Sequence, residues 1–355
     1  ILLLILLYTF EGGVKTIVYT DTLQTTFMLL GLIICIITII TKMDMSLGEI
    51  FASMKENKLS QIFNTDVKSS SYFLKHILGG MFITIAMTGL DQEMMQKNIS
   101  VRTLKDSQKN ILTLSTILIF VNLLFLFMGG LLYLYAAKTG ITVKGDDLFP
   151  TIALGGSLSV AISIIFIIGL ISALFPSADG ALTALTSSFC IDILGLKKKK
   201  HLTEKQKRTT RLTVHITFAV IFFLLTMMFK WIDDKSIIDV ILKVAGYTYG
   251  PLLGLFAFGI LTHRNIKDKY AIIVCLLSPL IIFGIDFINN PEWYITHFGL
   301  SAATAESLHS FSDKLFGGFK LGIEILIFNG LVTFLGLFLI SKKGEKRELE
   351  KEVND

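Results

Sequence analysis

Charged residues are scarce in this chain of 355 residues. Asp, Glu, Lys and Arg make up 17% of it, hydrophobic residues make up 52%, and the mean hydropathy is +0.68. A soluble domain carries about 25% charged residues, so this composition excludes an ordinary soluble protein and indicates an integral membrane protein. The net charge of +5 does not point to nucleic acid, because the basic residues lie in short loops between apolar stretches, where they act as topology signals.

Cysteine is equally scarce, with three thiols at Cys35, Cys190 and Cys275. Each lies alone in an apolar stretch without metal-ligand spacing or an evident partner, so we expect core or lipid-facing residues. The chain also lacks an initiator methionine and a signal-peptide pattern, since it begins at Ile1 inside the hydrophobic run ILLLILLYTF. We therefore expect an amino-terminally truncated sequence.

Long apolar stretches fill most of the chain, and windows of about 20 apolar residues predict membrane spans. The prediction is nine spans, counting a partial first one, near 1–10, 20–41, 73–95, 111–137, 156–190, 210–231, 236–261, 270–289 and 318–341. The longest is expected to continue as helix to Leu196, with tilt rather than a second crossing. The sequence thus predicts an all-α polytopic membrane protein, with a single transmembrane domain over 1–341 and a short charged tail over 342–355.

The placement of lysine and arginine predicts the orientation of these spans. The loop LKKKKHLTEKQKRTTR, residues 196–211, holds eight Lys or Arg against one Glu, so it is expected on the cytoplasmic side. Alternation from that loop puts 97–109, 263–269 and the basic carboxyl-terminal tail on the same side. We therefore expect a multi-pass protein of the cell membrane, plasma or inner, with a cytoplasmic carboxyl terminus.

The longest span also contains the most polar stretch at membrane depth, GLISALFPSADGALTALTSSFCIDIL at 169–194. A carboxylate such as Asp179 costs a few kcal/mol at the bilayer centre, so it is a functional-site hypothesis by default; the alternative is a packing role opposite a partner on another helix. Pro176 has no N–H, and the carbonyl of Ser172 therefore loses its helical donor. A freed carbonyl beside hydroxyls and a carboxylate suits a hard cation.

A few other polar residues interrupt the apolar spans. Asp21 and Gln24 lie one turn apart on one face of their helix. Lys243 lies about two turns inside its span, where snorkelling to the interface and a role in a cavity are equally open. Asp286 lies near the outer end of its span and is expected to have no special role. Because Gly246, Gly250 and Pro251 also break a span, as in secondary transporters, we predict a cation-coupled transporter.

Four stretches resemble spans of the sodium:solute symporter family, whose members carry sugars, proline, sialic acid, pantothenate or iodide. EGGVKTIVYTDTLQTTFMLLG resembles the segment entering the sixth span, TGLDQEMMQKNISVRTLKDSQKN the inner end of the seventh, SADGALTALTSSFCIDIL the ninth and GYTYGPLLGLFAFGI the eleventh. The resemblance implies a LeuT-like inverted-repeat fold (APC-type), with about nine transmembrane helices of an original thirteen. A chain without the first four spans is not expected to transport by itself.

The resemblance also implies sodium sites. Ala173 would supply a backbone carbonyl and Ser177 a hydroxyl to one Na+, while Pro176 stands where the family has a serine and frees the Ser172 carbonyl. Members with a second sodium use the aspartate that matches Asp21 together with hydroxyls at positions that here hold Asp179 and Gly180. Sodium is thus the expected coupling ion without other cofactors, and the ion stoichiometry and proton coupling stay open.

Substrate contacts implied by the resemblance fall on Thr84, Met87 and Thr88, with a further polar contact near Lys243. Met87 and Thr88 do not match the aromatic gate of the sugar carriers, which argues against a sugar. Lys243 favours an anionic or zwitterionic solute. We therefore expect sodium-coupled symport of a small organic solute or anion and not an enzyme, with sodium, the solute and the bilayer as partners and no nucleic acid.

Three other readings remain beside the symporter. Some relatives of the family are fused to signalling kinases, so a membrane solute sensor of the same fold is one alternative; the short tail after Ser341 counts against it. An intramembrane aspartyl protease using Asp91 and Asp179 lacks the expected Gly-x-Gly-Asp motif. A channel is disfavoured by the broken helices and by the lack of a repeated pore loop.

Overall fold

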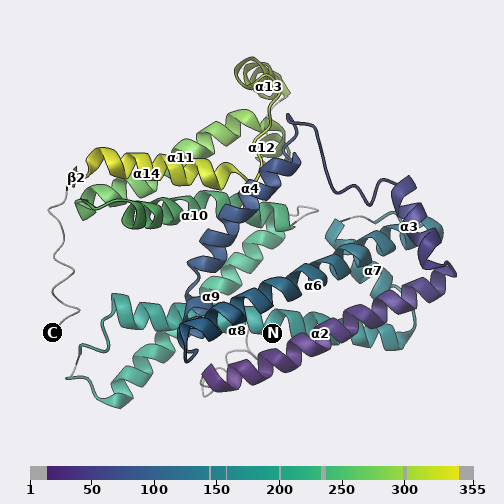
Figure 1. Cartoon of the computed structure of the whole chain (residues 1–355), viewed down its shortest axis with the longest axis horizontal. Helices are drawn as coiled ribbons and strands as arrows, with labels where there is room; N and C mark the ends of the chain where they lie inside the picture. The colour runs from purple at the N-terminus through teal and green to yellow at the C-terminus, as the bar shows by residue number, and fades with distance from the viewer. Residues whose placement is uncertain are drawn as a thin grey trace. The chain divides into compact units, whose positions relative to one another are not determined.

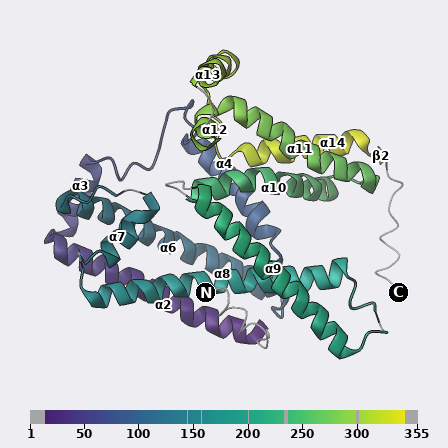
Figure 2. The ribbon, with the colours of Figure 1, turned by 180° about the vertical axis from the view of Figure 1, so that it is seen from behind.

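A computed structural model describes residues 14–143, 145–156, 158–199, 201–232, 237–298 and 302–343. These residues form mainly helices, and the chain divides into two compact units (Figures 1 and 2). Unit 1 comprises Ile1–Gln61 and Gln92–Ser236, and unit 2 comprises Ile62–Asp91 and Ile237–Asp355. Unit 2 is therefore built from two segments that are far apart in the sequence.

Among the described residues, unit 1 contains four long helices that overlap predicted spans and several short helices between them. They are α2 (Val14–Met43), α3 (Leu47–Glu56), α5 (Gln92–Ile99), α6 (Leu104–Thr139), the short 3-10 helix η2 (Gly145–Asp147), α7 (Leu148–Leu154), α8 (Val160–Ser188), the π-helix η3 (Phe189–Ile193) and α9 (Glu204–Ile232). Helix α2 packs along both α8 and α6, and α8 also packs against α9. The helix that begins at Val160 thus continues through η3 to Ile193, close to the predicted end at Leu196.

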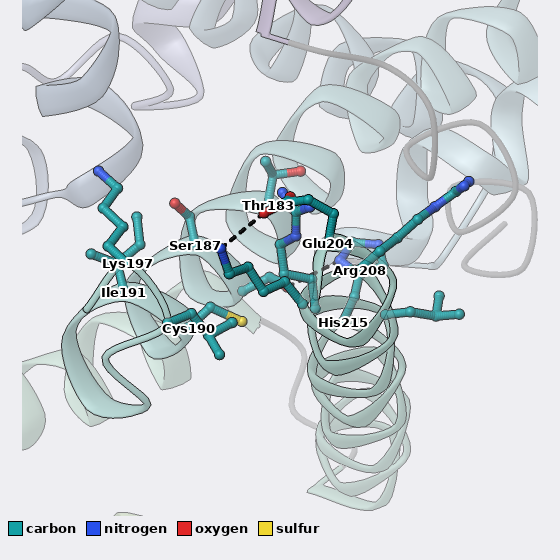
Figure 3. A pocket seen from close by; sticks show the side chains of 13 residues that line it. Thr183, Ser187, Cys190, Ile191, Lys197, Glu204, Arg208 and His215 are labelled. Atoms are coloured by element: carbon teal, nitrogen blue, oxygen red, sulfur yellow. Dashed lines mark hydrogen bonds and ion pairs between the residues drawn. The ribbon is translucent and has the colours of Figure 1, made fainter. Parts of the chain in front are cut away.

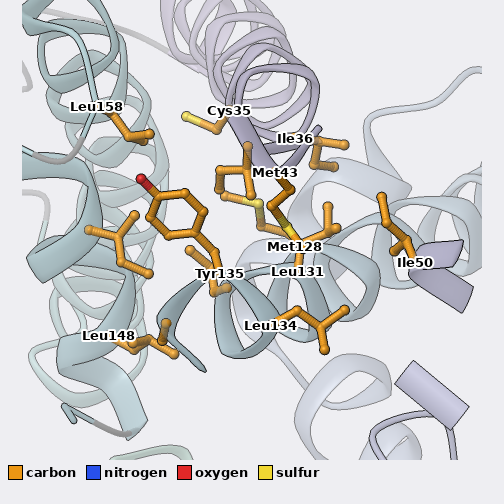
Figure 4. Packing of buried hydrophobic residues seen from close by; sticks show 14 of the residues in the cluster. Cys35, Ile36, Met43, Ile50, Met128, Leu131, Leu134, Tyr135, Leu148 and Leu158 are labelled. Atoms are coloured by element: carbon orange, nitrogen blue, oxygen red, sulfur yellow. The ribbon is translucent and has the colours of Figure 1, made fainter. Parts of the chain in front are cut away.

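Apolar side chains fill the space between the helices of unit 1. Ile39 of α2, Ile50 of α3 and Leu131 of α6 have no exposed surface, and they belong to one cluster that also draws on α7 and α8. Figure 4 shows Met43 and Met128 beside Leu131 in this cluster. Methionine side chains are flexible and fill irregular gaps, which suits a core formed by helices of different length and direction.

Unit 2 contains two short apolar helices, two long ones and two short helices after α11. They are α4 (Phe73–Ile83) with the π-helix η1 (Thr84–Gly89), α10 (Ile237–Leu261), α11 (Asp268–Asn289), α12 (Pro291–Phe298), α13 (Ala302–Phe316) and α14 (Ile325–Ile340). Lys75 of α4 donates hydrogen bonds to the carbonyls of Ser69 (2.9 Å) and Lys320 (2.8 Å). The bond to Lys320 joins α4 to the carboxyl-terminal part of the same unit.

Glycines on one face of α10 allow α14 to approach closely. A Cβ on Gly246 would lie 2.8 Å from Ile325, one on Gly250 2.2 Å from Asn329, and one on Gly254 2.5 Å from Thr333. These glycines recur every four residues, the spacing with which small residues line close helix contacts in membranes. Both views show α10 and α14 side by side (Figures 1 and 2).

Two short strands close the other end of this helix pair. β1 (Arg264–Asn265) follows α10 and pairs antiparallel with β2 (Lys342–Lys343) after α14, in the register Arg264↔Lys343. The guanidinium of Arg264 donates to the Oγ (2.6 Å) and the carbonyl (3.1 Å) of Ser341 and lies over the Phe338 ring. The pairing fixes the end of α14 to the turn between α10 and α11.

Six helices among the described residues are long and apolar enough to cross a membrane. They are Asp21–Met43, Leu104–Thr139, Val160–Ile193, Glu204–Met228, Val240–Leu261 and Asp268–Asn289. The shorter apolar helices Phe73–Gly89 and Ile325–Ile340 overlap two further predicted spans. The predicted partial span at 1–10 lies outside the described residues. The structure therefore confirms a mostly helical protein with several candidate spans, while the count of nine stays a prediction.

Candidate functional site

The polar stretch of α8 presents its predicted sodium ligands on two faces. Ser172 is 8% exposed and Asp179 has no exposed surface, whereas Ala173 and Ser177 are exposed. The interval from 172 to 179 is two helical turns and that from 173 to 177 is one, so each pair shares a face. Thr183 donates a hydrogen bond to Oδ1 of Asp179 (3.4 Å). The helix thus separates a buried carboxylate from an exposed carbonyl and hydroxyl.

Helix α2 brings further oxygen atoms to the level of Asp179. Gly31 of α2 lies against Ile165 and Gly169 of α8, while the residues around Ile39 cluster with Leu158 and Ile162 at the start of α8. The two helices therefore run antiparallel. Both helices rise by the same distance per residue. Asp21 lies ten residues before Gly31 in α2, and the segment of Ser177 and Asp179 lies about ten residues beyond the contact of Gly31 in α8. The two segments are therefore at the same level.

Gln24 contributes an acceptor that was not among the predicted ligands. Its Oε1 atom is buried and accepts no hydrogen bond from the described residues. A buried carbonyl oxygen without a donor costs about 1–3 kcal/mol, and such oxygens are ligands of hard cations. The sequence signal was present, because Gln24 lies one turn from Asp21 on the same face of α2.

The predicted substrate residues Thr84, Met87 and Thr88 all lie on the π-helix η1. Thr84 donates to the carbonyl of Gly80 (2.9 Å), and both threonines are exposed, while Met87 is half-buried. Ala86 packs in a cluster with Leu253 of α10 and Leu326 of α14. Single π-turns inside helices occur frequently at functional sites. This one presents two hydroxyls away from the contact with α10 and α14.

Lys243, the fourth predicted substrate residue, forms an ion pair in unit 2. Its Nζ lies 2.9 Å from Oδ2 of Asp286, and the two side chains are 18% and 1% exposed. The same nitrogen lies 4.2 Å from the ring centre of Trp293 and 4.4 Å from that of Tyr294. The ammonium group is therefore stabilised by a carboxylate and by two aromatic faces, rather than reaching away from the protein.

Asp286 was expected to have no special role, and that interpretation is wrong. The hydroxyls of Tyr247 and Tyr294 each lie 2.5 Å from its Oδ2, and Asn290 donates to its Oδ1 (2.7 Å). Burial and the hydrogen bond to this carboxylate raise the pKa of Tyr294. Two opposite charges inside neighbouring apolar helices are a signal for such a pair, because an ionised group in a membrane helix needs a partner.

A cavity of about 510 Å³ opens beside this network in unit 2. Lys243, Asp286 and Asn290 line it together with Trp293, and the carboxyl-terminal part of the unit contributes Lys320. Thr84, Met87 and Thr88 are not among its lining residues. The structure therefore places Lys243 in a polar cavity but does not bring it together with the three residues of η1.

Comparisons with known proteins agree with the resemblance in the sequence. The profile of the sodium:solute symporter family matches residues 1–272. The sodium/sialic acid symporter SiaT of Proteus mirabilis is 25% identical over 274 residues, which are 74% of this chain and 54% of that protein. The sodium/sialic acid symporter NanT of Aliivibrio fischeri is 22% identical over 74% of this chain and 52% of its own length.

A solved structure has a similar fold. It is the substrate-bound outward-open state of a Na+-coupled sialic acid symporter, with a TM-score of 0.67 at 16% identity, over 96% of this chain and 66% of that one. The chain spans about half the length of the sequence relatives. These relatives are sodium-coupled transporters and not enzymes, as the sequence predicted. Since the family profile matches 1–272, most of its length, the chain belongs to the sodium:solute symporter family.

Proposed function

We propose that this chain serves sodium-coupled secondary active symport of a small organic solute across the cell membrane, within a LeuT-like inverted-repeat fold. The observation that carries the proposal is the fully buried Asp179 on α8, opposite the segment of α2 that holds Asp21 and the buried amide oxygen of Gln24. Carboxylate and amide oxygens at one depth of two packed membrane helices suit a hard cation.

The proposed sodium ligands form two groups rather than one. Successive residues of an α-helix are about 100° apart around its axis, so Ala173 and Ser177 point away from Ser172 and Asp179. One ion would bind on the exposed side at the Ala173 carbonyl and the Ser177 hydroxyl. The buried side, with Asp179, Ser172 and Asp21, would hold a second ion or a proton.

Sodium drives the solute only through a difference in affinity. If sodium binds more tightly to the state in which the solute pocket is formed, bound sodium raises the affinity for the solute. The bound solute must then raise the affinity for sodium by the same factor. In this scheme the π-turn at Thr84, Met87 and Thr88 contributes to the solute pocket. Lys243 lines a different cavity and would meet the solute there, with a charge balanced by Asp286 that accommodates a zwitterion as well as an anion.

The first solute to test is a sialic acid. Two relatives carry that solute in their names, and the solved structure of similar fold is a sialic acid symporter. A sialic acid is an acidic sugar, so it satisfies the expectation of an anion although the residues of η1 argued against a sugar. We propose one transmembrane domain with its carboxyl terminus in the cytoplasm.

Uptake into proteoliposomes, measured with a full-length protein that contains this chain, tests the sodium site. Ser177→Ala removes a hydroxyl ligand, so the sodium concentration for half-maximal uptake of radiolabelled sialic acid is expected to rise about tenfold, the change that corresponds to the loss of about 1.4 kcal/mol of binding. Thr116→Val is the matched control, because it removes a hydroxyl of α6 that donates only within its helix to Leu112. An unchanged sodium dependence in Ser177→Ala would remove Ser177 from the site.

Proton coupling is the second candidate, and the complete burial of Asp179 favours it. Asp179→Asn keeps the size of the side chain and removes the titratable group. Loss of the response of uptake to an imposed pH gradient, with the sodium response kept, would assign the proton to Asp179. Wild-type responses to both gradients would return Asp179 to a packing role.

A further inference from the structure

A second cavity lies within unit 1, between the carboxyl end of α8 with η3 and the first turns of α9. Its volume is about 540 Å³, in the range of small-molecule sites. Cys190 of η3 and Val214 of α9 belong to an apolar cluster at this contact, and Phe189 packs on Phe218 at 5.8 Å between ring centres. The two walls are thus joined by apolar packing that includes Cys190, itself a lining residue of the cavity.

The wall formed by α9 is cationic. Lys207, Arg208 and Arg211 line the cavity from this helix, and Lys197 lines it from the turn before. Lys207 and Arg208 lie four and three residues before Arg211, so both are neighbours of Arg211 on one side of the helix. One carboxylate, that of Glu204, lines the same space and pairs with Lys207 at 2.8 Å. Basic side chains are therefore in clear excess.

The wall formed by α8 is rich in hydroxyls. Thr183, Thr186 and Ser187 line the cavity, and Figure 3 shows Thr183 and Ser187 between Lys197 on one side and Arg208 on the other. His215 is 8% exposed, and its Nδ1 lies 3.0 Å from Oγ1 of Thr186. Hydroxyls and cations facing one space supply the hydrogen-bond donors that a phosphate group needs.

Positive charge in a cytoplasmic loop is also a topology signal, but the cavity uses only part of that charge. Lys198, Lys199 and Lys205 belong to the same basic stretch and do not line the cavity. A topology signal requires no cavity, no hydroxyl wall and no grouping of Lys207, Arg208 and Arg211 on one side of a helix. Basic pockets between membrane helices on the cytoplasmic side bind lipid headgroups.

We propose that this cavity binds a phosphate-bearing anion at the cytoplasmic surface, with Arg208 and Arg211 as its principal ligands and Ser187 as a hydroxyl donor. The phosphate belongs either to the headgroup of an anionic phospholipid of the inner leaflet or to a soluble phosphate. Thr183 lines this cavity and also donates to Asp179 of the proposed ion site, so the test measures binding and not uptake and leaves Thr183 unchanged.

Thermal unfolding of the purified protein distinguishes the two sources. One arm compares nanodiscs of phosphatidylcholine with nanodiscs that also contain phosphatidylglycerol; the other titrates inorganic phosphate against chloride of equal ionic strength in detergent. A ligand that binds the folded state raises the melting temperature in proportion to ln(1 + [L]/Kd). A rise in either arm supports the site, and the arm that responds identifies the source.

Variants show whether the response belongs to the cavity. The pair Arg208→Gln and Arg211→Gln is expected to weaken the apparent affinity at least tenfold, and Ser187→Ala to weaken it about threefold without a change of charge. The matched pair Lys198→Gln and Lys205→Gln removes the same charge outside the cavity and is expected to keep the wild-type affinity. An equal loss in both pairs, or no rise in either arm, would overturn the proposal.

Discussion

Buried polar side chains in unit 2 join one helix to another, whereas hydroxyls in unit 1 bond mostly within their own helix. In unit 2 Asn329 of α14 donates to the carbonyls of Gly246 (3.0 Å) and Tyr247 (2.8 Å) of α10 and accepts from Ser278 of α11 (2.6 Å). In unit 1 Thr26 and Thr217 donate to carbonyls four residues earlier. Apolar packing around Ile39 and Leu131 joins the helices of unit 1 instead.

The difference suits the two units to different tasks. A hydroxyl that is bonded within its own helix can rotate toward an ion without breaking a contact between helices. The hydroxyls of unit 1 are therefore suited to bind an ion. A polar side chain that joins three helices cannot do so without loosening them, because each group left unpaired costs its full desolvation. The polar residues of unit 2 therefore act first as structure, and Lys243 is both structural and a candidate ligand.

The largest expected effect comes from the ion pair of unit 2. Asp286→Ala removes the carboxylate that pairs with the Lys243 ammonium and accepts from Tyr247 and Tyr294, whose hydroxyls keep the bond to each other (2.8 Å). Breaking a buried pair costs about 3–5 kcal/mol. Thermal unfolding in detergent should show a much lower melting temperature. The double variant Lys243→Met, Asp286→Leu replaces the pair by apolar groups and should recover much of the loss. A wild-type melting temperature for Asp286→Ala would contradict a structural role for this network.

A smaller effect is expected at the contact of α10 with α14. Gly250→Ala introduces a methyl group 2.2 Å from Asn329, and overpacking of this kind typically costs about 1–3 kcal/mol. Gly259→Ala on the same helix is the matched control, since a Cβ there meets nothing within 4 Å. The ratio of the two melting-temperature shifts measures how strongly unit 2 depends on this contact. Equal shifts would show that it does not.

The smallest effect is expected at the cap of α3 in unit 1. Glu49 accepts hydrogen bonds from the backbone N–H (2.7 Å) and the hydroxyl (2.8 Å) of Ser46, which lower its pKa. Ser46→Ala removes the cap at a cost of about 1 kcal/mol. The pKa of Glu49 is lower in the folded protein than its usual value. Its ionised carboxylate therefore contributes to folding stability at a pH above the usual pKa, and this contribution is lost as the pH falls through the pKa of the folded state. The difference between wild type and variant, measured by thermal unfolding, should therefore shrink in acid; a difference independent of pH would contradict the role of the Glu49 carboxylate.

The sequence predicted the helices well, because hydropathy and the length of an apolar run follow from the residues alone. It also predicted the polar character of α8 around Asp179. It did not predict the π-turn at Thr84 or the partners of Asp286. Whether a helix accommodates an extra residue per turn depends on its neighbours, and Lys243 and Asp286 meet only through the packing of α10 on α11.

The contact of Gly250 with Asn329 shows another limit. Gly246, Gly250 and Pro251 were expected to break a span, and that interpretation is wrong, because α10 is one helix from Ile237 to Leu261 and its glycines instead allow α14 to approach. The same limit holds for Gln24, whose place beside Asp21 was visible in the sequence while the burial of its amide oxygen was not. Local signals thus identified candidate residues, and only the tertiary structure assigned their partners.

The bond from Lys75 to the carbonyl of Lys320 has a consequence for synthesis. Unit 2 begins with 62–91, and its remaining residues start at Ile237. A ribosome therefore synthesises α4 and then all of 92–236 before any helix partner of α4 in this unit exists. Lys75 has its local acceptor, the Ser69 carbonyl, from the start, and it finds the Lys320 carbonyl only when 320 has been translated. During that interval the lysine has one of its two carbonyl acceptors, and the last helices to emerge complete an element made early.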